Sequence, residues 1–299
     1  MGFKDRIKNA VKSLLGKPLS TPHVSSHDYR LIIEDQGSLL GKTVLVTGGT
    51  GGIGSAICYD LAAKGAIVGI SGRNEKKIID TVERIKKESP AVAENLIPVV
   101  LDVNKDEQIQ KVIREFSENQ GKIDVFINNA GGQPGKLGAY NKHLFEQPID
   151  QIDLVLDTNL RGTLLCSREI CGVMAKQGFG HIISMASVIG IGGKAGYADY
   201  AATKAAIIGL TKSLALEMAE YNVRVNCISP GTINQVPFDS GSEPLSSKLN
   251  PMHRAGFTKE IAETVAFLIK NEFITGQNII VDGGRSLGLY GDTTRWQSD

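Results

Sequence analysis

The chain alternates short apolar runs with longer segments of helical periodicity, and this alternation constrains the fold more than any other feature. Parallel strands need crossover connections, so the pattern is typical of βαβ units whose sheet is covered on both faces. The sequence predicts strands at residues 43–47, 66–70, 96–101, 123–127, 181–185, 223–228 and 277–281. It predicts helices at residues 74–89, 105–120, 151–177, 200–220 and 259–270, besides one that follows the first strand and ends near Gly65. We therefore expect an α/β fold, a doubly wound, Rossmann-like parallel sheet of about seven strands, with ligands at the carboxyl ends of the strands.

The length of 299 residues fits one large α/β domain with extensions at both ends. We expect the domain to span residues 40–285, between an N-terminal extension (1–39) and a C-terminal tail (286–299). Apolar residues recur at helical spacing near the N-terminus, flanked by lysines, and predict a short basic amphipathic helix followed by a connector. We expect this helix to pack on the domain or on a second subunit, with contact to a membrane surface as the alternative.

The composition excludes several classes of function. The 33 lysines and arginines nearly balance the 32 aspartates and glutamates, which argues against nucleic acid as the main partner. The four cysteines form no CxxC pair, so we expect reduced thiols in a cytoplasmic protein. The five histidines are scattered, so we expect no metal site, and no apolar run reaches the ~18 residues of a membrane span.

A glycine-rich turn joins the first predicted strand to the first helix, in the sequence TGGTGGIG from Thr47 to Gly54. Gly48 permits the tight turn, Gly52 allows a diphosphate to approach the backbone, and Gly54 allows helix and strand to pack closely. The amides at the helix N-terminus favour negative charge. The spacing is TGxxxGxG rather than GxGxxG, and the alternative is a flexible loop; the strand–turn–helix context favours cofactor binding.

Tyr200 and Lys204 form the second motif, since residues four apart lie on the same face of a helix. A phenol has a pKa near ~10, and a nearby ammonium group lowers it toward the working range of an acid/base catalyst. The alternative is a chance pair of surface residues. Ser187 stands thirteen positions before Tyr200, at the end of the fifth predicted strand, where a hydroxyl group can hydrogen-bond a substrate carbonyl.

These motifs, with Asn128-Asn129-Ala130-Gly131 after the fourth strand and Pro230-Gly231 after the sixth, occur together in one order and spacing. In this the chain resembles the short-chain dehydrogenase/reductase family, over roughly residues 40–285. The resemblance implies three groups of cofactor-binding residues, which contact the diphosphate, the adenosine and the nicotinamide. They are Gly48, Gly52, Ile53 and Gly54; Asp102, Val103, Asn129, Ala130 and Gly131; and Pro230, Gly231 and Ile233, respectively.

The resemblance also implies the chemistry. Ser187 would polarise a carbonyl group, Tyr200 would exchange the proton, and Lys204 would bind the nicotinamide ribose. Asn159 would hold a water that connects Lys204 to solvent. The activity implied is hydride transfer between nicotinamide and a carbonyl or secondary alcohol, as in 3-oxoacyl-thioester reductases or sugar and alcohol dehydrogenases. The alternative is a cofactor-binding scaffold docked through the N-terminal helix. We also expect a homodimer or homotetramer, formed by the helices that contain Asn159 and Tyr200.

The choice between NADP and NAD depends on the residues after the second strand. An acidic residue there binds the ribose hydroxyls of NAD, but this chain has Ser71-Gly72-Arg73-Asn74. Arg73 is suited to pair with the 2′-phosphate of NADP, which we therefore favour, with NAD as the alternative. Two departures from the family bear on the cofactor: Gly51 stands where many NADP-dependent members have a basic residue, and Gln235 where many members have a threonine.

Overall fold

The computed structural model describes residues 38–132, 143–235 and 250–287. By its internal contacts the chain divides into two units, Met1–Ser38 and Leu39–Asp299, and the second contains every helix and strand of the described residues. The predicted N-terminal helix and most of the predicted C-terminal tail lie outside the described residues. No helix in the described ranges combines the length and the apolar character that a membrane crossing requires.

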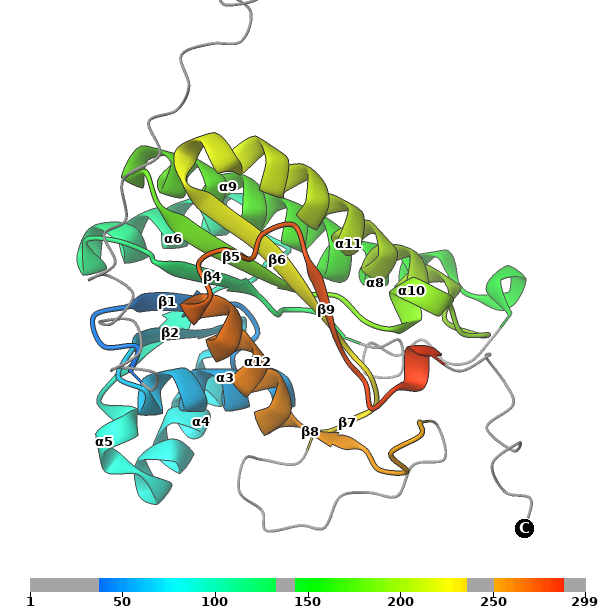
Figure 1. The fold of residues 1–299 in the computed structure, drawn as a ribbon, viewed down its shortest axis with the longest axis horizontal. Coiled ribbons are helices and arrows are strands. Elements are labelled where there is room, and N and C mark those ends of the chain that lie inside the picture. The colour runs from blue at the N-terminus through cyan, green and yellow to red at the C-terminus, as the bar shows by residue number, and fades with distance from the viewer. Residues whose placement is uncertain (1–37, 133–142, 236–249, 288–299) are drawn as a thin grey trace, which may run out of the picture. The chain divides into compact units, whose positions relative to one another are not determined.

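A parallel sheet of seven strands forms the centre of the structure, which confirms the predicted fold class (Figure 1). The strands are β1 (Thr43–Val46), β2 (Ile67–Gly72), β3 (Leu96–Val100), β4 (Val125–Asn128), β5 (Gly180–Met185), β6 (Val223–Pro230) and β9 (Asn278–Val281). Their order across the sheet is β3-β2-β1-β4-β5-β6-β9, so the direction of winding reverses between β1 and β4. In sheets of this kind ligands bind at that reversal, outside the carboxyl ends of the strands.

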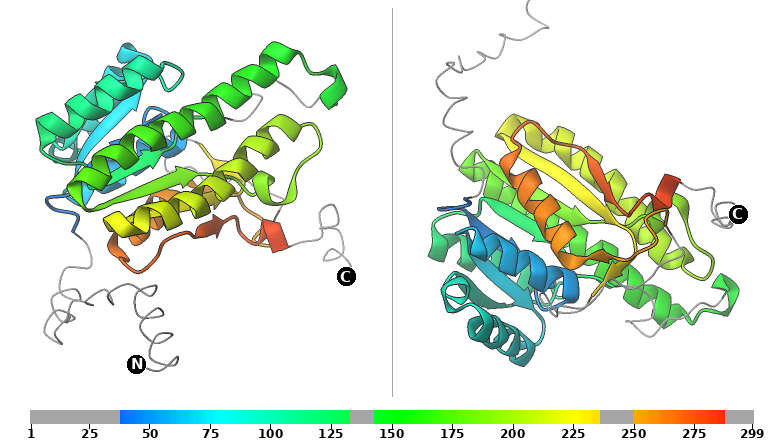
Figure 2. Two further views of the ribbon diagram at one scale, coloured as in Figure 1. Left: turned by 90° about the horizontal axis from the view of Figure 1, so that it is seen from above. Right: turned by 60° about the horizontal axis from the view of Figure 1, so that its bottom comes forward.

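Helices cover both faces of the sheet. One face carries α3 (Gly52–Ala63), α4 (Glu75–Glu88), α5 (Pro90–Ala93) and α12 (Thr258–Lys270), and the other carries α6 (Asp106–Gln120), α9 (Gly162–Gln177) and α11 (Ala198–Met218). Figure 2 shows blue α3 beside orange α12 on the first face, and green α9 with yellow-green α11 on the second.

The alternation of side chains along each strand explains this double layer. Val44 and Val46 of β1 pack on the side of α3 and α12, whereas Leu45 between them packs on the side of α6 and α9. All three side chains are fully buried. A strand buried on both faces is apolar at every position, which is why the strands are continuous apolar runs in the sequence.

The remaining elements are short, and several of them were not predicted. They are α8 (Ile149–Leu156), α10 (Ile189–Gly192), the pair β7 (Ile233–Asn234) and β8 (Gly256–Phe257), and the turns η1 (Leu144–Glu146), η2 (Asp157–Arg161), η3 (Ala219–Tyr221) and η4 (Arg285–Leu287). The helix predicted at 151–177 is divided by η2, a π-helical turn, into α8 and α9. The β7–β8 ladder was not predicted, because each strand has only two residues.

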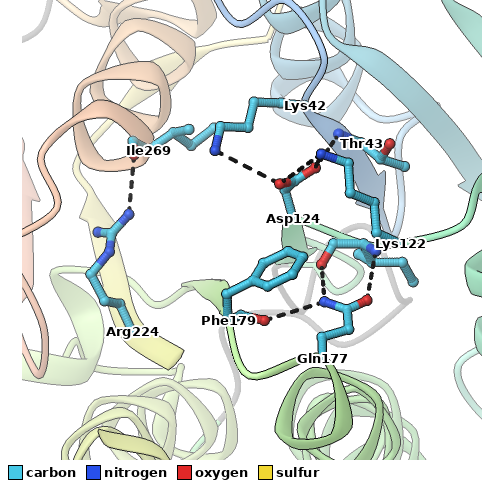
Figure 3. A network of polar contacts seen from close by, with 9 residues as sticks. Lys42, Thr43, Lys122, Asp124, Gln177, Phe179, Arg224 and Ile269 are labelled. Atoms are coloured by element: carbon cyan, nitrogen blue, oxygen red, sulfur yellow. Dashed lines mark hydrogen bonds and ion pairs between the residues drawn. The ribbon is translucent and has the colours of Figure 1, made fainter. Parts of the chain in front are cut away.

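At the amino end of the sheet, opposite the edge where ligands bind, the carboxylate of Asp124 joins the starts of β1 and β4 (Figure 3). Its Oδ2 accepts a hydrogen bond from the Thr43 amide at 2.8 Å and lies 2.9 Å from the ammonium of Lys122. Lys42 is further away, 3.7 Å from Oδ1. Asp124 is 7% exposed, so its charge depends on these partners rather than on water.

Two further side chains hold the same end of the sheet. Gln177, at the end of α9, accepts from the amide of Ile123 and donates to the carbonyl oxygens of Ile123 and Phe179. Arg224 on β6 donates to the carbonyl oxygens of Leu268 and Ile269, among others, at the end of α12. A cation at this position satisfies helix carbonyl groups that have no partner within the helix. Side chains therefore hold the starts of the strands and the ends of α9 and α12 together at the amino end of the sheet.

We predict that Asp124→Ala lowers the free energy of unfolding by about 2–3 kcal/mol, because the buried Thr43 amide loses its charged acceptor. Lys42→Ala is the matched control: its ammonium is distant and the side chain is 45% exposed, so the expected loss is below about 1 kcal/mol. Urea unfolding at neutral pH measures both values. Equal losses in the two variants would show that Asp124 does not hold the strands together.

Candidate active site

A cleft of about 150 Å³ opens at the point where the winding of the sheet reverses. Its walls come from the glycine turn before α3, the loop after β4, the end of β5, the first turns of α11 and the loop after β6. Most of the predicted site residues line it: Gly48, Gly52, Ile53, Gly54, Asn129, Ala130, Gly131, Ser187, Tyr200, Lys204, Pro230, Gly231 and Ile233. Segments as far apart in sequence as β1 and β6 therefore contribute to one cleft.

The glycine turn is held to the loop after β4 by hydrogen bonds to its main chain. The side-chain amide of Asn129 donates to the carbonyl oxygens of Thr47 and Gly48, at 3.1 and 3.0 Å. Gly48 has a φ of +64°, and a β-carbon added to it would lie 2.8 Å from Cα of Ala130. A side chain at this position would therefore be strained by its backbone conformation and would also clash.

The N-terminus of α3 faces the cleft without a side-chain cap. Gly51 is the N-cap residue, and it has no side chain with which to bind the first amides of the helix. A β-carbon added at Gly51 would meet nothing closer than the Gly48 oxygen at 3.4 Å, so this side of the turn is open. Amides at an uncapped helix N-terminus suit an anionic group such as a diphosphate. The residues present thus fit a dinucleotide cofactor.

Ser187, Tyr200 and Lys204 converge on the cleft from two elements. Tyr200 and Lys204 lie one turn apart on α11, and Ser187 follows β5 closely. All three are buried, with exposed fractions of 6%, 5% and 7% for Tyr200, Lys204 and Ser187. The Ser187 and Tyr200 side chains share a hydrogen bond, and the Lys204 ammonium lies 5.7 Å from the centre of the Tyr200 ring. The spacing of thirteen residues therefore brings the two hydroxyl groups together.

Burial controls the pKa values of Tyr200 and Lys204. It raises the pKa of Tyr200 to about 12, and the hydrogen bond with Ser187 opposes that rise. Burial also lowers the pKa of Lys204 to about 8. The expectation that Lys204 lowers the pKa of the phenol is therefore not met in the chain alone. The physical reason is that desolvation of the phenolate has the largest effect on this pKa, while the Lys204 nitrogen donates to the Met185 carbonyl at 2.8 Å.

Asn159 lies behind the cleft rather than on its wall. It is fully buried in the π-helical turn η2, where its side chain exchanges two hydrogen bonds with the main chain of Gly132, at 2.8 and 3.2 Å. A β-carbon added to Gly131 would collide with Asn159 Oδ1 and would lie 3.7 Å from the Lys204 nitrogen. Gly131 therefore lies close to both the Asn159 side chain and the Lys204 ammonium. Such π-helical turns are frequent at functional sites.

Three predicted cofactor residues lie outside the cleft lining, at the ends of β2 and β3. Arg73 follows β2 and is exposed, and the carboxylate of Asp102 accepts a hydrogen bond from the amide of Asn104 at 3.1 Å. Val103 is 7% exposed and packs in the core, beside the start of α9. All three are at the carboxyl edge of the sheet, on the far side of β1 from Tyr200. This is the direction in which a dinucleotide would extend from the glycine turn.

The cleft is also lined by Gly51 of the glycine turn, by Gly132, expected as part of a pocket wall, by Gln235, and by Met185 and Ala186, which were not predicted. Met185 and Ala186 directly precede Ser187, so the end of β5 could have identified them. Gln235, at the position where many members of the family have a threonine, does line the cleft, but its contact with Gly52 was not predicted: its β-carbon is 2.8 Å from the position of an added Gly52 β-carbon.

Comparison with known proteins identifies the family. A family model described as enoyl-(acyl carrier protein) reductase matches residues 48–286. The chain is 35% identical to the 3-oxoacyl-(acyl-carrier-protein) reductase FabG of Staphylococcus epidermidis, over 82% of this chain and 99% of that protein. It belongs to the short-chain dehydrogenase/reductase family. The FabG protein of Thermotoga maritima is 36% identical over 82% of this chain and 98% of its own length.

Two similar solved structures agree with this assignment. The structure of ElxO with NADP bound is 31% identical, covers 83% of this chain and 99% of its own, and has a TM-score of 0.74. A short-chain type dehydrogenase/reductase from Mycobacterium marinum is 27% identical, covers 86% of this chain and 99% of its own, and has a TM-score of 0.75. The predicted family and fold are confirmed, and the chain is an NAD(P)-dependent oxidoreductase.

Proposed function

We propose that the chain is an NADPH-dependent reductase that acts on a 3-oxoacyl thioester or a carbonyl compound of similar shape. The observation that carries this proposal is the convergence of Ser187, Tyr200 and Lys204 in the cleft that the glycine turn also lines. The names of the FabG relatives support the substrate class, and the NADP in the ElxO structure supports the cofactor. Reduction of a sugar ketone, or oxidation of the corresponding alcohol, uses the same residues.

The residues of the cleft suit a cofactor that lies across it. The α3 amides and Gly52 face a diphosphate, while Pro230 and Gly231 flank the opposite end, beside Tyr200. When bound there, the nicotinamide supplies the hydride to the substrate carbon. Lys204 would bind the nicotinamide ribose, which requires its ammonium to leave the Met185 carbonyl or to share it.

The two hydroxyl groups have different tasks in this proposal. Ser187 donates a hydrogen bond to the substrate carbonyl oxygen and stabilises the charge that develops on it. Tyr200 transfers its proton to the same oxygen. A phenol with a raised pKa keeps its proton at neutral pH, so Tyr200 is in the protonated form that reduction requires. After the transfer, the nearby Lys204 ammonium stabilises the phenolate. Asn159, which lies behind Lys204, would hold the water through which a replacement proton arrives.

We predict that Tyr200→Phe lowers kcat for NADPH-dependent reduction of a 3-oxoacyl thioester by about 10²–10⁴-fold, because the proton donor is lost. The Kd of NADPH, measured by its fluorescence, should change by less than about threefold. The matched control is Tyr197→Phe, which removes a hydroxyl group three residues earlier, from a ring that holds the Lys194 ammonium 4.0 Å from its centre. Turnover that is unchanged by Tyr200→Phe would exclude the mechanism.

A cofactor-binding scaffold is the competing function. It is distinguished by the same assay with the unaltered chain: NADPH binding without turnover on 3-oxoacyl thioesters, ketones and sugar ketones would favour the scaffold. The buried position of Tyr200 beside Ser187 favours the enzyme, since a protein that only binds the cofactor has no use for a buried proton donor.

Arg73 is the residue on which the proposed preference for NADP over NAD depends. It follows β2, is exposed, and has no carboxylate partner among the ion pairs of the described residues. We predict that Arg73→Ala weakens NADPH binding by about 10- to 100-fold, the equivalent of about 1.5–3 kcal/mol for a charge-assisted contact. NADH binding should be unaffected. Lys76→Ala, which removes an exposed cation one turn further on, is the control, and equal effects of both variants would argue against a 2′-phosphate contact.

We also propose a cytoplasmic homodimer or homotetramer in which α9 and α11 form an interface. All four cysteines are free thiols, as in a reducing compartment. Leu164 on α9 and Leu216 on α11 are 42% and 83% exposed, which suits helices that pack against a second copy. Light scattering should give the mass of two or four chains, and Leu216→Lys should lower it. A single-chain mass at micromolar concentration would exclude this interface.

A further inference from the structure

The turn that carries Ser187 rests directly on the helix that carries Tyr200 and Lys204, and a glycine makes this possible. Gly190 lies in α10, the short helix that begins two residues after Ser187. A β-carbon added at Gly190 would lie 2.6 Å from the carbonyl carbon of Lys204 and 2.7 Å from the nitrogen of Ala205. The main chains of α10 and α11 are therefore in contact one helical turn after Tyr200.

Local hydrogen bonds couple Gly190 to Ser187. The Gly190 amide donates to the Ser187 carbonyl oxygen at 2.9 Å, and the Ile189 amide donates to the Ser187 hydroxyl oxygen at 3.2 Å. A displacement of Gly190 away from α11 would therefore displace the Ser187 side chain with it. The distance between the Ser187 and Tyr200 hydroxyl groups depends on how closely the two main chains approach.

The requirement for glycine at this position is steric. The φ of Gly190 is not in the left-handed region, and the residue lies in a helix, where alanine is favoured over glycine by about 1 kcal/mol. Local conformation therefore does not exclude a side chain; the neighbouring helix does. That helix, α11, has 21 residues and packs on β5 and β6, whereas α10 has four residues and is joined to its neighbours by short connections. An added methyl group would thus move α10 rather than α11.

We propose that Gly190 is a positioning residue for the reaction described above: its missing side chain sets the separation between the Ser187 and Tyr200 hydroxyl groups. The inference rests on the proposed function. It implies that substitution of Gly190 changes the separation of the Tyr200 and Ser187 hydroxyl groups but leaves the cofactor site intact. The added β-carbon would meet α11 at the main chain of Lys204 and at its β-carbon, 2.9 Å away, so this outcome requires the four-residue α10 to move while the 21-residue α11 keeps its place.

Gly190 substitution should also change the pKa of Tyr200. The groups that face Tyr200 are the hydroxyl of Ser187, the ring of Tyr197 and the ammonium of Lys204. The carboxylate of Asp199 is also near, and it accepts a hydrogen bond from the Tyr200 main-chain amide. Of these, Ser187 is the group that α10 positions. Since the Ser187 hydrogen bond lowers the pKa of the phenol, loss of this bond should raise it.

The experiment compares Gly190→Ala with Gly209→Ala. Gly209 lies on α11, and an added β-carbon there meets nothing within 4 Å among the described residues. Kinetics with NADPH and a 3-oxoacyl thioester, NADPH binding and native mass are measured for both variants. We expect Gly190→Ala to lower kcat by about 10- to 100-fold, with NADPH Kd within about threefold of the unaltered chain, and Gly209→Ala to retain kcat. The pH profile of kcat should shift to a higher pKa in Gly190→Ala alone.

The pKa of Tyr200 is measured independently of turnover, in the NADP-bound protein labelled with ¹³Cζ-tyrosine, with Tyr200→Phe to assign the resonance. An upward shift in Gly190→Ala supports the inference even where the substrate class is wrong, and an unchanged pKa overturns it. A parallel loss of NADPH affinity and of thermal stability in Gly190→Ala also overturns it, since the glycine would then serve folding alone. Absence of turnover in the unaltered chain contradicts the proposed function and not the role of Gly190.

Discussion

The hydrogen bonds from Asn129 to the carbonyl oxygens of Thr47 and Gly48 are the contacts on which the site depends. They join the loops after β1 and β4, the two strands between which the winding of the sheet reverses. Helices leave these strands toward opposite faces, so a cleft opens there, and the Asn129 amide holds its two sides together. The glycine turn can then leave the amides at the start of α3 without a side-chain partner, available to a diphosphate.

Burial shifts the pKa values of Tyr200 and Lys204 in opposite directions. The pKa of Tyr200 rises and that of Lys204 falls, because each loses the hydration of its charged form. Each shift favours the neutral form of its side chain, so the phenol retains its proton at neutral pH. In the proposed reduction, the Lys204 ammonium would attract the phenolate that forms when Tyr200 gives up its proton, so it would stabilise the product of proton transfer more than the starting state.

Much of the fold and of the site could be predicted from the sequence. The seven parallel strands follow from buried apolar runs, and Ser187, Tyr200 and Lys204 follow from a spacing that helix and strand geometry translate into proximity. The break of the long helix at Asp157–Arg161 could not be predicted, since a π-helical turn depends on contacts such as that of Asn159 with Gly132. Nor could the contact of Gln235 with Gly52, which joins residues far apart in the chain.

The sequence by itself determined the class of the fold, the segments that form strands and the side chains that follow the carboxyl ends of those strands. These depend on local periodicity and spacing. Only the tertiary structure decided how those groups behave. The direction of the Tyr200 pKa shift depends on how much water the surrounding elements exclude. The need for glycine at position 190 depends on where α11 passes. Desolvation and close packing involve residues that are distant in sequence, so no local pattern records them.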